Sequence, residues 1–338
     1  MTTPTATEVA QSAREVPFEF RGVGSEFFKI WIVNIMLTII TLGIYSAWAT
    51  VRTNRYFYAN TYLDSESFRY LADPITILKG RLIAVAGFIF YFVASNLFPV
   101  VGVLLAIALL FALPFFVIRS IAFSNRMTAY RNVQFRFKGT YGGAFMALLV
   151  WPMLGVLTLG ILYPLALLKA NQFVVSNCAY GATPFSFEAK TWDYGKVFLL
   201  FVGMLAATAA ITFAVASTVS ELASGIVAAL GYILALGYIT VSLINIYYNA
   251  TSLGPHRLSA HLETVGYLKI FVSNAILTIL TLGLYLPFAQ VRMSNYRASH
   301  TTFLAEGSLS DFAAAEQQQV SALGDQLGEV FGFDVGAF

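Results

Sequence analysis

Long apolar runs, separated by short polar stretches, dominate this chain of 338 residues. A membrane-spanning helix needs about 20 consecutive apolar residues. Runs near or above that length occupy residues 30–49, 82–118 (long enough for two helices), 142–168, 197–216, 226–248 and 270–290. The pattern predicts a polytopic membrane protein with about seven hydrophobic segments.

A second pattern, with a period of two, flanks the first two of these segments. Residues 18–22 and 135–139 alternate apolar and charged side chains and end in glycine, and residues 67–71 and 184–187 are similarly strand-like. Such alternation is typical of half-buried strands. The predicted fold is therefore an all-α polytopic membrane protein with small cytoplasmic β elements.

One hydrophobic segment recurs three times. Residues 31–56 and 271–296 share twelve identities without a gap, and a weaker copy lies between them at a shift of 117 residues. Because a fixed period marks a repeat architecture, we interpret the shared positions as a structural repeat motif. They are Asn34, Thr38, Thr41, Gly43, Tyr45, Thr158, Gly160, Asn274, Thr278, Thr281, Gly283 and Tyr285.

The repeats divide the chain into two full units and a half unit. The predicted divisions are a disordered N-terminus (1–17), unit 1 (18–134), unit 2 (135–256), a half unit (257–300) and an acidic C-terminal tail (301–338). The tail carries six acidic residues and no Lys or Arg, although the whole chain has a net charge of +3. Within the tail, residues 311–324 are expected to form a short helix, and 325–338 to be disordered or bound to a partner.

Basic residues predict the topology. All twenty Lys and Arg avoid residues 82–118 and 197–256, and these residues accumulate in cytoplasmic loops. The turns near 96–99 and 217–225 are therefore expected outside. All twenty lie in the cytoplasm only if the three repeated segments, 30–49, 142–168 and 270–290, enter and leave on the same side. The sequence Thr41-Leu-Gly43 provides a turn for such re-entry, whereas their length alone favours crossing.

Two sets of polar residues are candidate sites. The first is a basic set that is a candidate for binding anionic lipid headgroups and that also suits ordinary interfacial anchoring. It consists of Arg52, Arg55, Lys169, Arg292 and Arg297. The second is the Asn and Thr stripe of the repeat motif, which favours hydrogen bonds between packed helices over a polar path.

Neither a metal site nor a catalytic set is predicted. The three histidines lack the i, i+4 spacing of a zinc helix, and the single cysteine excludes a cysteine cage. Glu221 is the only carboxylate in the long paired apolar stretches, and it falls in a predicted turn. We therefore expect no cofactor, no metal, no enzymatic activity and no nucleic-acid partner.

The run from Thr41 to Arg52, Asn60-Thr61 after it and Phe18-x-Phe20-x-Gly22 before it resemble the YjgN family of polytopic inner-membrane proteins. The resemblance covers roughly residues 18–300 and departs from the family in the turn at 63–68, where glycine is expected. It implies an inner-membrane location, no cofactor and no catalytic residues, with a membrane metallopeptidase as one partner.

These observations favour a non-enzymatic scaffold or adaptor for another membrane protein, with membrane lipids as further partners and the acidic tail as the docking element. The alternative is a channel or facilitated transporter formed between the internal repeats. A continuous polar path across the bilayer would distinguish the second hypothesis from the first.

Overall fold

Ten short strands form a closed antiparallel barrel in the computed structural model, which describes residues 14–331. Each strand pairs with the strands before and after it along the chain, and β1 pairs with β10 to close the barrel. The strands are β1 (Arg14–Phe20), β2 (Thr61–Leu63), β3 (Glu66–Tyr70), β4 (Thr128–Tyr130), β5 (Val133–Phe137), β6 (Cys178–Tyr180), β7 (Thr183–Phe187), β8 (Thr251–Leu253), β9 (His256–Ala260) and β10 (Thr301–Ala305).

This barrel overturns the predicted all-α fold with only small β elements. The strand-like sequences at 18–22, 67–71 and 135–139 overlap β1, β3 and β5, and 184–187 lies within β7. The other strands have three to five residues, so each shows too little alternation to be recognised from sequence. Pairing between distant segments forms them instead: Phe303 of β10, for example, lies opposite Leu258 of β9 and Val16 of β1.

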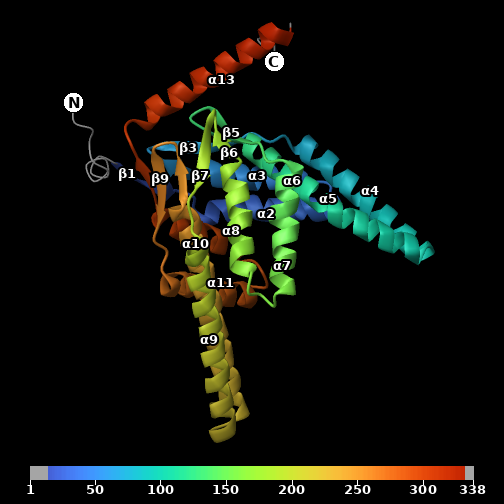
Figure 1. Cartoon of the computed structure of the whole chain (residues 1–338), viewed down its shortest axis with the longest axis vertical. Helices are drawn as coiled ribbons and strands as arrows, with labels where there is room; N and C mark the ends of the chain where they lie inside the picture. The colour runs from blue at the N-terminus through green and yellow to red at the C-terminus, as the bar shows by residue number, and fades with distance from the viewer. Residues whose placement is uncertain (1–13, 332–338) are drawn as a thin grey trace.

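Five helical hairpins connect the strands along one rim of the barrel (Figure 1). Each leaves one strand and returns to its antiparallel neighbour, so both of its ends lie at that rim. Three hairpins are formed by the repeated segments. They are α2 (Gly24–Ile40) with α3 (Ser46–Ala59), α6 (Tyr141–Phe145), η1 (Met146–Val150) and α7 (Trp151–Leu157) with α8 (Tyr163–Ser176), and α11 (Thr264–Leu280) with α12 (Leu286–Ser299). The repeated segments thus enter and leave on one side, as the basic residues indicated.

Two longer hairpins alternate with these three. They are α4 (Pro74–Leu97) with α5 (Pro99–Arg126), and α9 (Thr191–Thr218) with α10 (Glu221–Asn249). All four helices are long and apolar enough to cross a membrane. Their helices join at Phe98 and at 219–220, within the turns that the sequence predicted. The two long hairpins leave the barrel in different directions (Figure 1).

The opposite rim carries the tight strand turns. Asp64 and Ser65 join β2 to β3, and both have positive φ (49° and 66°). This is the conformation of a two-residue type I′ turn, whose backbone twist matches that of paired strands. The glycine expected in this turn is therefore replaced by residues that accept the left-handed region there. Arg131 (φ 46°) and Asn132 (φ 63°) repeat this conformation in the β4–β5 turn, and Gly181 (φ 60°) and Gly254 (φ 56°) occupy the first position of the β6–β7 and β8–β9 turns.

The C-terminal segment also folds onto the barrel. Residues 301–305 are strand β10, and α13 (Leu309–Phe331) then begins at the tight-turn rim and rises away from the barrel (Figure 1). The predicted free acidic tail is thus wrong for its first part, whereas the predicted helix at 311–324 is confirmed. Residues 325–331 continue α13, and 332–338 lie outside the described residues. At the other end, β1 begins at Arg14, so residues 14–17 of the expected disordered N-terminus are in a strand and residues 1–13 lie outside the described residues.

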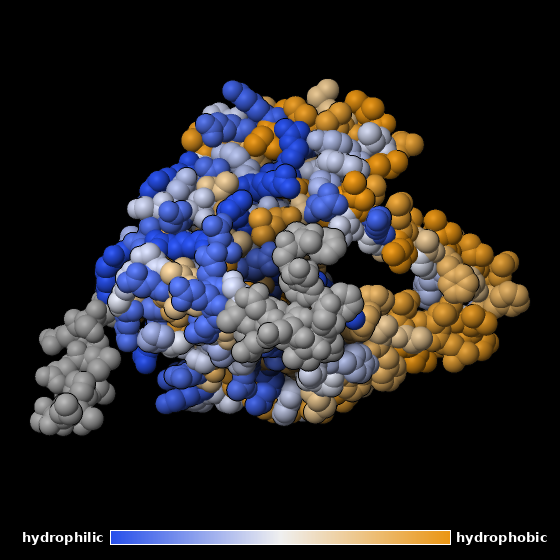
Figure 2. Space-filling view, turned by 90° about the horizontal axis from the view of Figure 1, so that it is seen from above, coloured by the Kyte–Doolittle hydropathy of each residue, from blue (hydrophilic) through white to orange (hydrophobic). Residues whose placement is uncertain are grey.

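The polar surface lies on the barrel, and the apolar surface lies on the long hairpins. Figure 2 shows hydrophilic residues gathered over the barrel and hydrophobic ones on the hairpin that projects to the right, α4–α5. In the four long helices, between 0% and 17% of the apolar window is buried within the chain. These surfaces are suited to lipid or to another membrane protein, and the barrel to the water phase.

Candidate binding site in the barrel

An apolar cavity of about 200 Å³, partly open to its surroundings, lies within the barrel. Its walls come from nearly every strand, because residues of alternate positions point to the lumen. Tyr248, at the end of α10, lines the end that faces the helical hairpins. The other lining residues are Phe18, Leu63, Phe68, Tyr130, Phe135, Tyr180, Phe185, Leu253, Leu258, Phe303, Leu309 and Phe312.

The hydroxyl groups of two lining tyrosines are satisfied by the barrel itself. Tyr130 donates to the carbonyl oxygen of Leu63 at 2.8 Å, and Tyr180 donates to that of Tyr130 at 3.0 Å. Burial raises the pKa of both phenols, so both are neutral at physiological pH. With these hydroxyls bound to backbone, the rings present their apolar faces to the cavity.

The first turns of helix α13 cover part of the tight-turn rim of the barrel. Leu309 and Phe312 line the cavity, and Phe312 stacks on Tyr180 with ring centroids 5.9 Å apart. One turn further, Glu316 is 2% exposed. Its carboxylate accepts hydrogen bonds from the backbone nitrogens of Ala182 (2.6 Å) and Thr183 (3.2 Å) and from the Thr183 hydroxyl. A buried carboxylate with several donors is a strong, specific contact, so it fixes the first turns of α13 at the rim.

His256 lies under the same helix. It is 1% exposed and packs between Phe303 and Phe312, with its ring 4.6 Å from that of Phe312 in an edge-on arrangement. Nδ1 accepts a hydrogen bond from the backbone nitrogen of Glu306 at 3.0 Å, and Nε2 has no hydrogen-bond partner. Burial lowers the pKa of His256. The neutral ring therefore carries its proton on Nε2, among the aromatic rings.

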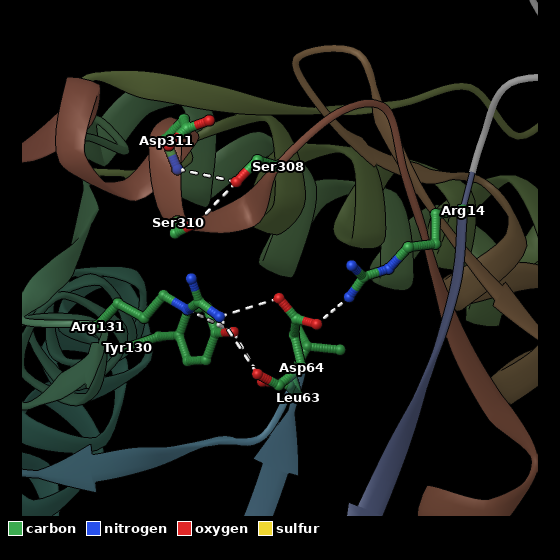
Figure 3. Close-up of polar contacts among 8 residues, drawn as sticks. All are labelled: Arg14, Leu63, Asp64, Tyr130, Arg131, Ser308, Ser310 and Asp311. Carbon is green, nitrogen blue, oxygen red and sulfur yellow. Dashed lines mark hydrogen bonds and ion pairs between the residues drawn. The ribbon is translucent and has the colours of Figure 1, made fainter.

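A small ionic cluster completes this rim (Figure 3). Asp64, in the β2–β3 turn, pairs with Arg14 of β1 and with Arg131 of the β4–β5 turn, the latter at 2.9 Å. Arg131 also donates to the Tyr130 hydroxyl at 3.1 Å. The cluster ties β1 and two turns together beside the start of α13, where Ser308 caps the helix by accepting from the Asp311 nitrogen.

The Thr-Leu-Gly sequences of the repeat motif form the turns of the three short hairpins. In the first, the Thr41 hydroxyl donates to the Leu37 carbonyl at 2.7 Å and accepts from the Tyr45 nitrogen at 2.9 Å. Gly43 has φ 91°, and its nitrogen donates to the Thr38 carbonyl at 2.7 Å. Thr158 with Gly160, and Thr281 with Gly283 and Thr278, repeat these bonds. Backbone groups in the turn are thus satisfied internally, as non-helical backbone in a membrane requires.

The asparagines of the motif join the two helices of a hairpin. Asn34 donates to the Ala49 carbonyl at 3.4 Å, and Asn274 donates to the Ala289 carbonyl at 3.2 Å. Asn274 also accepts from Arg292 at 2.8 Å, whereas Oδ1 of the buried Asn34 has no partner. In the described part of the chain these polar groups are therefore used between helices.

The five basic candidates lie on three different hairpins. Arg292 and Arg52 donate to the hydroxyls of Tyr285 (3.2 Å) and Tyr45 (3.1 Å) in their own hairpins. Arg55 donates to the Ala72 carbonyl at 3.3 Å. Lys169 lies near Gln172 in α8, and Arg297 is exposed in the last turn of α12. The structure does not gather them into one site, and lipid binding by these residues stays a prediction.

Among the side chains that the structure describes, those of residues 14–321, no group of three or more His, Cys, Asp or Glu could hold a metal ion. His261 lies 3.0 Å from the Ser259 hydroxyl, and His300 lies 2.8 Å from the Tyr296 carbonyl. These histidines therefore have different hydrogen-bond partners and do not form one site. Sequence reasoning missed the aromatic lumen, although the alternating Phe residues at 18, 135 and 185 were its visible signal. It also missed Glu316, for which no local signal exists.

Comparison with known proteins assigns the chain to a family. Residues 15–330 match the family described as "Bacterial protein of unknown function (DUF898)". The chain is 31% identical over 162 residues to the inner membrane protein YjgN of Escherichia coli O157:H7, which covers 46% of this chain and 40% of that protein. It is 33% identical over 146 residues to YjgN of Salmonella typhimurium, which covers 42% of this chain and 36% of that protein.

The matched region thus spans well under half the length of these relatives, and no solved structure matches the chain. The expected resemblance to the YjgN family is confirmed, as is the inner-membrane location, because the matched relatives bear that name and the chain has four helices able to span a membrane. The chain belongs to the DUF898 family of bacterial proteins and is a multi-pass inner-membrane protein.

Proposed function

We propose that this protein is a non-enzymatic adaptor for another integral membrane protein, which it binds through its two long hairpins. The observation that carries the proposal is that these hairpins do not form a bundle with each other. They leave the barrel in different directions (Figure 1), and at most 17% of the apolar window of any of their helices is buried. Their faces are therefore available to helices of a partner.

Exposed glycines on the long hairpins support a close helix contact. At Gly80 and Gly87 of α4, Gly203 of α9 and Gly225 of α10, an added Cβ would meet no atom within 4 Å. Glycines inside the hairpins are different, since Gly102 packs on Ser95 and Gly231 on Thr208. Small residues on a helix surface let a second backbone approach closely in a membrane, so the open glycines mark faces for a partner helix.

The barrel favours the adaptor over the channel. Its lumen is lined by aromatic and aliphatic side chains, and α13 covers part of one rim. Ions and polar solutes need polar groups along their route, and the lumen offers them none within the described residues. A facilitator would have to use some other path.

The acidic tail contributes less to this proposal than the sequence suggested. Leu309, Phe312 and Glu316 dock the first turns of α13 on the barrel of the same chain, which leaves residues 325–338 as the part that could reach a partner. A membrane metallopeptidase, the partner class that the family resemblance implies, is one candidate.

The test is photo-crosslinking in native membranes, followed by purification. Gly87→Leu and Gly203→Leu should each reduce recovery of the cross-linked partner, because leucine prevents close helix approach. Gly142→Leu is the matched control, since that glycine is equally open but lies in α6 of a short hairpin. None of the three should lower the melting temperature. Undiminished recovery of the partner with both Gly87→Leu and Gly203→Leu would refute the proposal. A chain that ends at residue 324 tests the contribution of the tail separately.

A further inference from the structure

We infer that the barrel cavity is a binding site for a small uncharged hydrocarbon group, either a single aromatic ring or the end of an alkyl chain. This site is independent of the adaptor surface proposed above, which lies on the long hairpins. Its ligand class follows from the volume of the cavity, the chemistry of its walls and the way it is partly covered.

Volume gives the size of the ligand. The cavity measures about 200 Å³, whereas an engineered apolar cavity of about 150 Å³ in another protein stays dry and binds benzene or xenon. A site somewhat larger than that accepts one substituted ring or a short alkyl segment. Well-packed protein interiors contain few voids larger than a water molecule, so a cavity of this size inside a ten-stranded barrel is unusual.

The walls exclude polar ligands. The hydroxyls of Tyr130 and Tyr180 already donate to backbone carbonyls, so neither has a proton left to donate to a polar ligand. Nε2 of His256 has no hydrogen-bond partner, but His256 is not among the residues that line the cavity, and its ring packs edge-on against that of Phe312. Because a buried polar group without a partner is costly, the site selects against hydroxyl, amide and charged groups inside the cavity.

The partial cover of the cavity allows exchange. One wall is the first turns of α13, which contribute Leu309 and Phe312 and are fixed by the hydrogen bonds of Glu316. This wall is a separate element that follows β10, and it can move without breaking a strand pairing. The opposite end is lined by Tyr248 of α10, and we infer that the end of an alkyl chain from the bilayer enters the cavity there.

The experiment uses ¹⁹F NMR of the full chain in lipid nanodiscs with two probes, fluorobenzene and 8-fluorooctanoate. A resonance absent from empty nanodiscs is expected for at least one probe, and the probe that gives it distinguishes a free ring from a chain end. Leu258→Trp places a larger side chain in the cavity and should abolish that resonance. Leu199→Trp is the matched control, because Leu199 is 66% exposed on α9, and it should leave the resonance unchanged.

Two further variants keep the inference testable if Leu258→Trp does not fold. Leu253→Phe fills less of the cavity and should weaken binding of the same probe. Glu316→Gln leaves the walls intact and should speed exchange of the bound probe, seen as broadening of its resonance. The inference is overturned if neither probe gives a protein-specific resonance. It is also overturned if that resonance persists in a folded Leu258→Trp variant, or if a folded Leu253→Phe variant binds the probe with unchanged affinity. Partner recovery should stay normal in these variants, which separates this result from the adaptor test.

Discussion

Replacing Gly43 by alanine tests whether the repeat motif stabilises the protein through backbone conformation. Gly43 has φ 91°, and an added Cβ would meet no atom within 4 Å. Steric contact with neighbours therefore does not change the stability of the variant. The free energy of unfolding should fall by about 1–2 kcal/mol, which is the cost of the left-handed region for a residue with a Cβ. The turn cannot relax easily, because the Gly43 nitrogen and carbonyl are hydrogen-bonded to Thr38 and Ser46.

Gly87→Ala is the matched control. Gly87 is also open to its surroundings but lies within helix α4, where alanine is more favourable than glycine by about 0.8–1 kcal/mol. The same chemical change should thus destabilise at one site and stabilise at the other, with a difference of roughly 2–3 kcal/mol. Gly43→Asn should cost less than Gly43→Ala, since asparagine tolerates the left-handed region better.

The assay is unfolding of each variant in detergent, measured both as the melting temperature and as the free energy of unfolding from a denaturant titration. Combining the substitution at Gly43, Gly160 and Gly283 should cost about 3–6 kcal/mol, because distant sites usually act additively. If Gly43→Ala and Gly87→Ala change stability equally, these turns do not depend on glycine, and the explanation of the repeat motif is wrong.

Three further outcomes are expected. Cysteines placed at Phe98 and Val219 should react with an impermeant maleimide from outside the cell, whereas one at Asn60 should not, because the distribution of basic residues predicts that the two hairpin joins are outside and the barrel rim is cytoplasmic. Labelling at Asn60 would contradict this predicted topology. Burial lowers the pKa of folded His256, so the unfolded chain binds the proton more tightly. The free energy of unfolding should therefore fall as the pH drops below about 6.5. This fall should be smaller in His256→Gln, and identical pH profiles for the two proteins would contradict the prediction. Burial raises the pKa of Cys178 to about 11, so at pH 7 it should react with maleimide far more slowly than an ordinary thiol, and rapid labelling of the folded protein would show otherwise.

The sequence by itself determined the membrane class and the repeats, and it predicted a topology in which each repeated segment returns to the side from which it starts. Apolar runs are read from local composition, and the basic residues report the side of the membrane without any knowledge of packing. The Thr41-Leu-Gly43 turn was also visible, because glycine and threonine carry local conformational meaning. Position 43 adopts a left-handed backbone conformation that is unfavourable for alanine, and the Thr41 hydroxyl forms hydrogen bonds with backbone groups only a few residues away.

Only the tertiary structure decided the barrel and its contents. Strands such as Thr61–Leu63 have too few residues to show a period, and they become strands because hairpins return the chain beside a neighbouring strand. Phe18 and Phe303 lie 285 positions apart in the chain, and only closure of the barrel by β1 and β10 brings both to one cavity. Likewise, Glu316 resembles any acidic residue of a polar tail until α13 docks at the rim and places its carboxylate on the nitrogens of Ala182 and Thr183. Such contacts join segments that are distant in the chain, and no local pattern in the sequence records them.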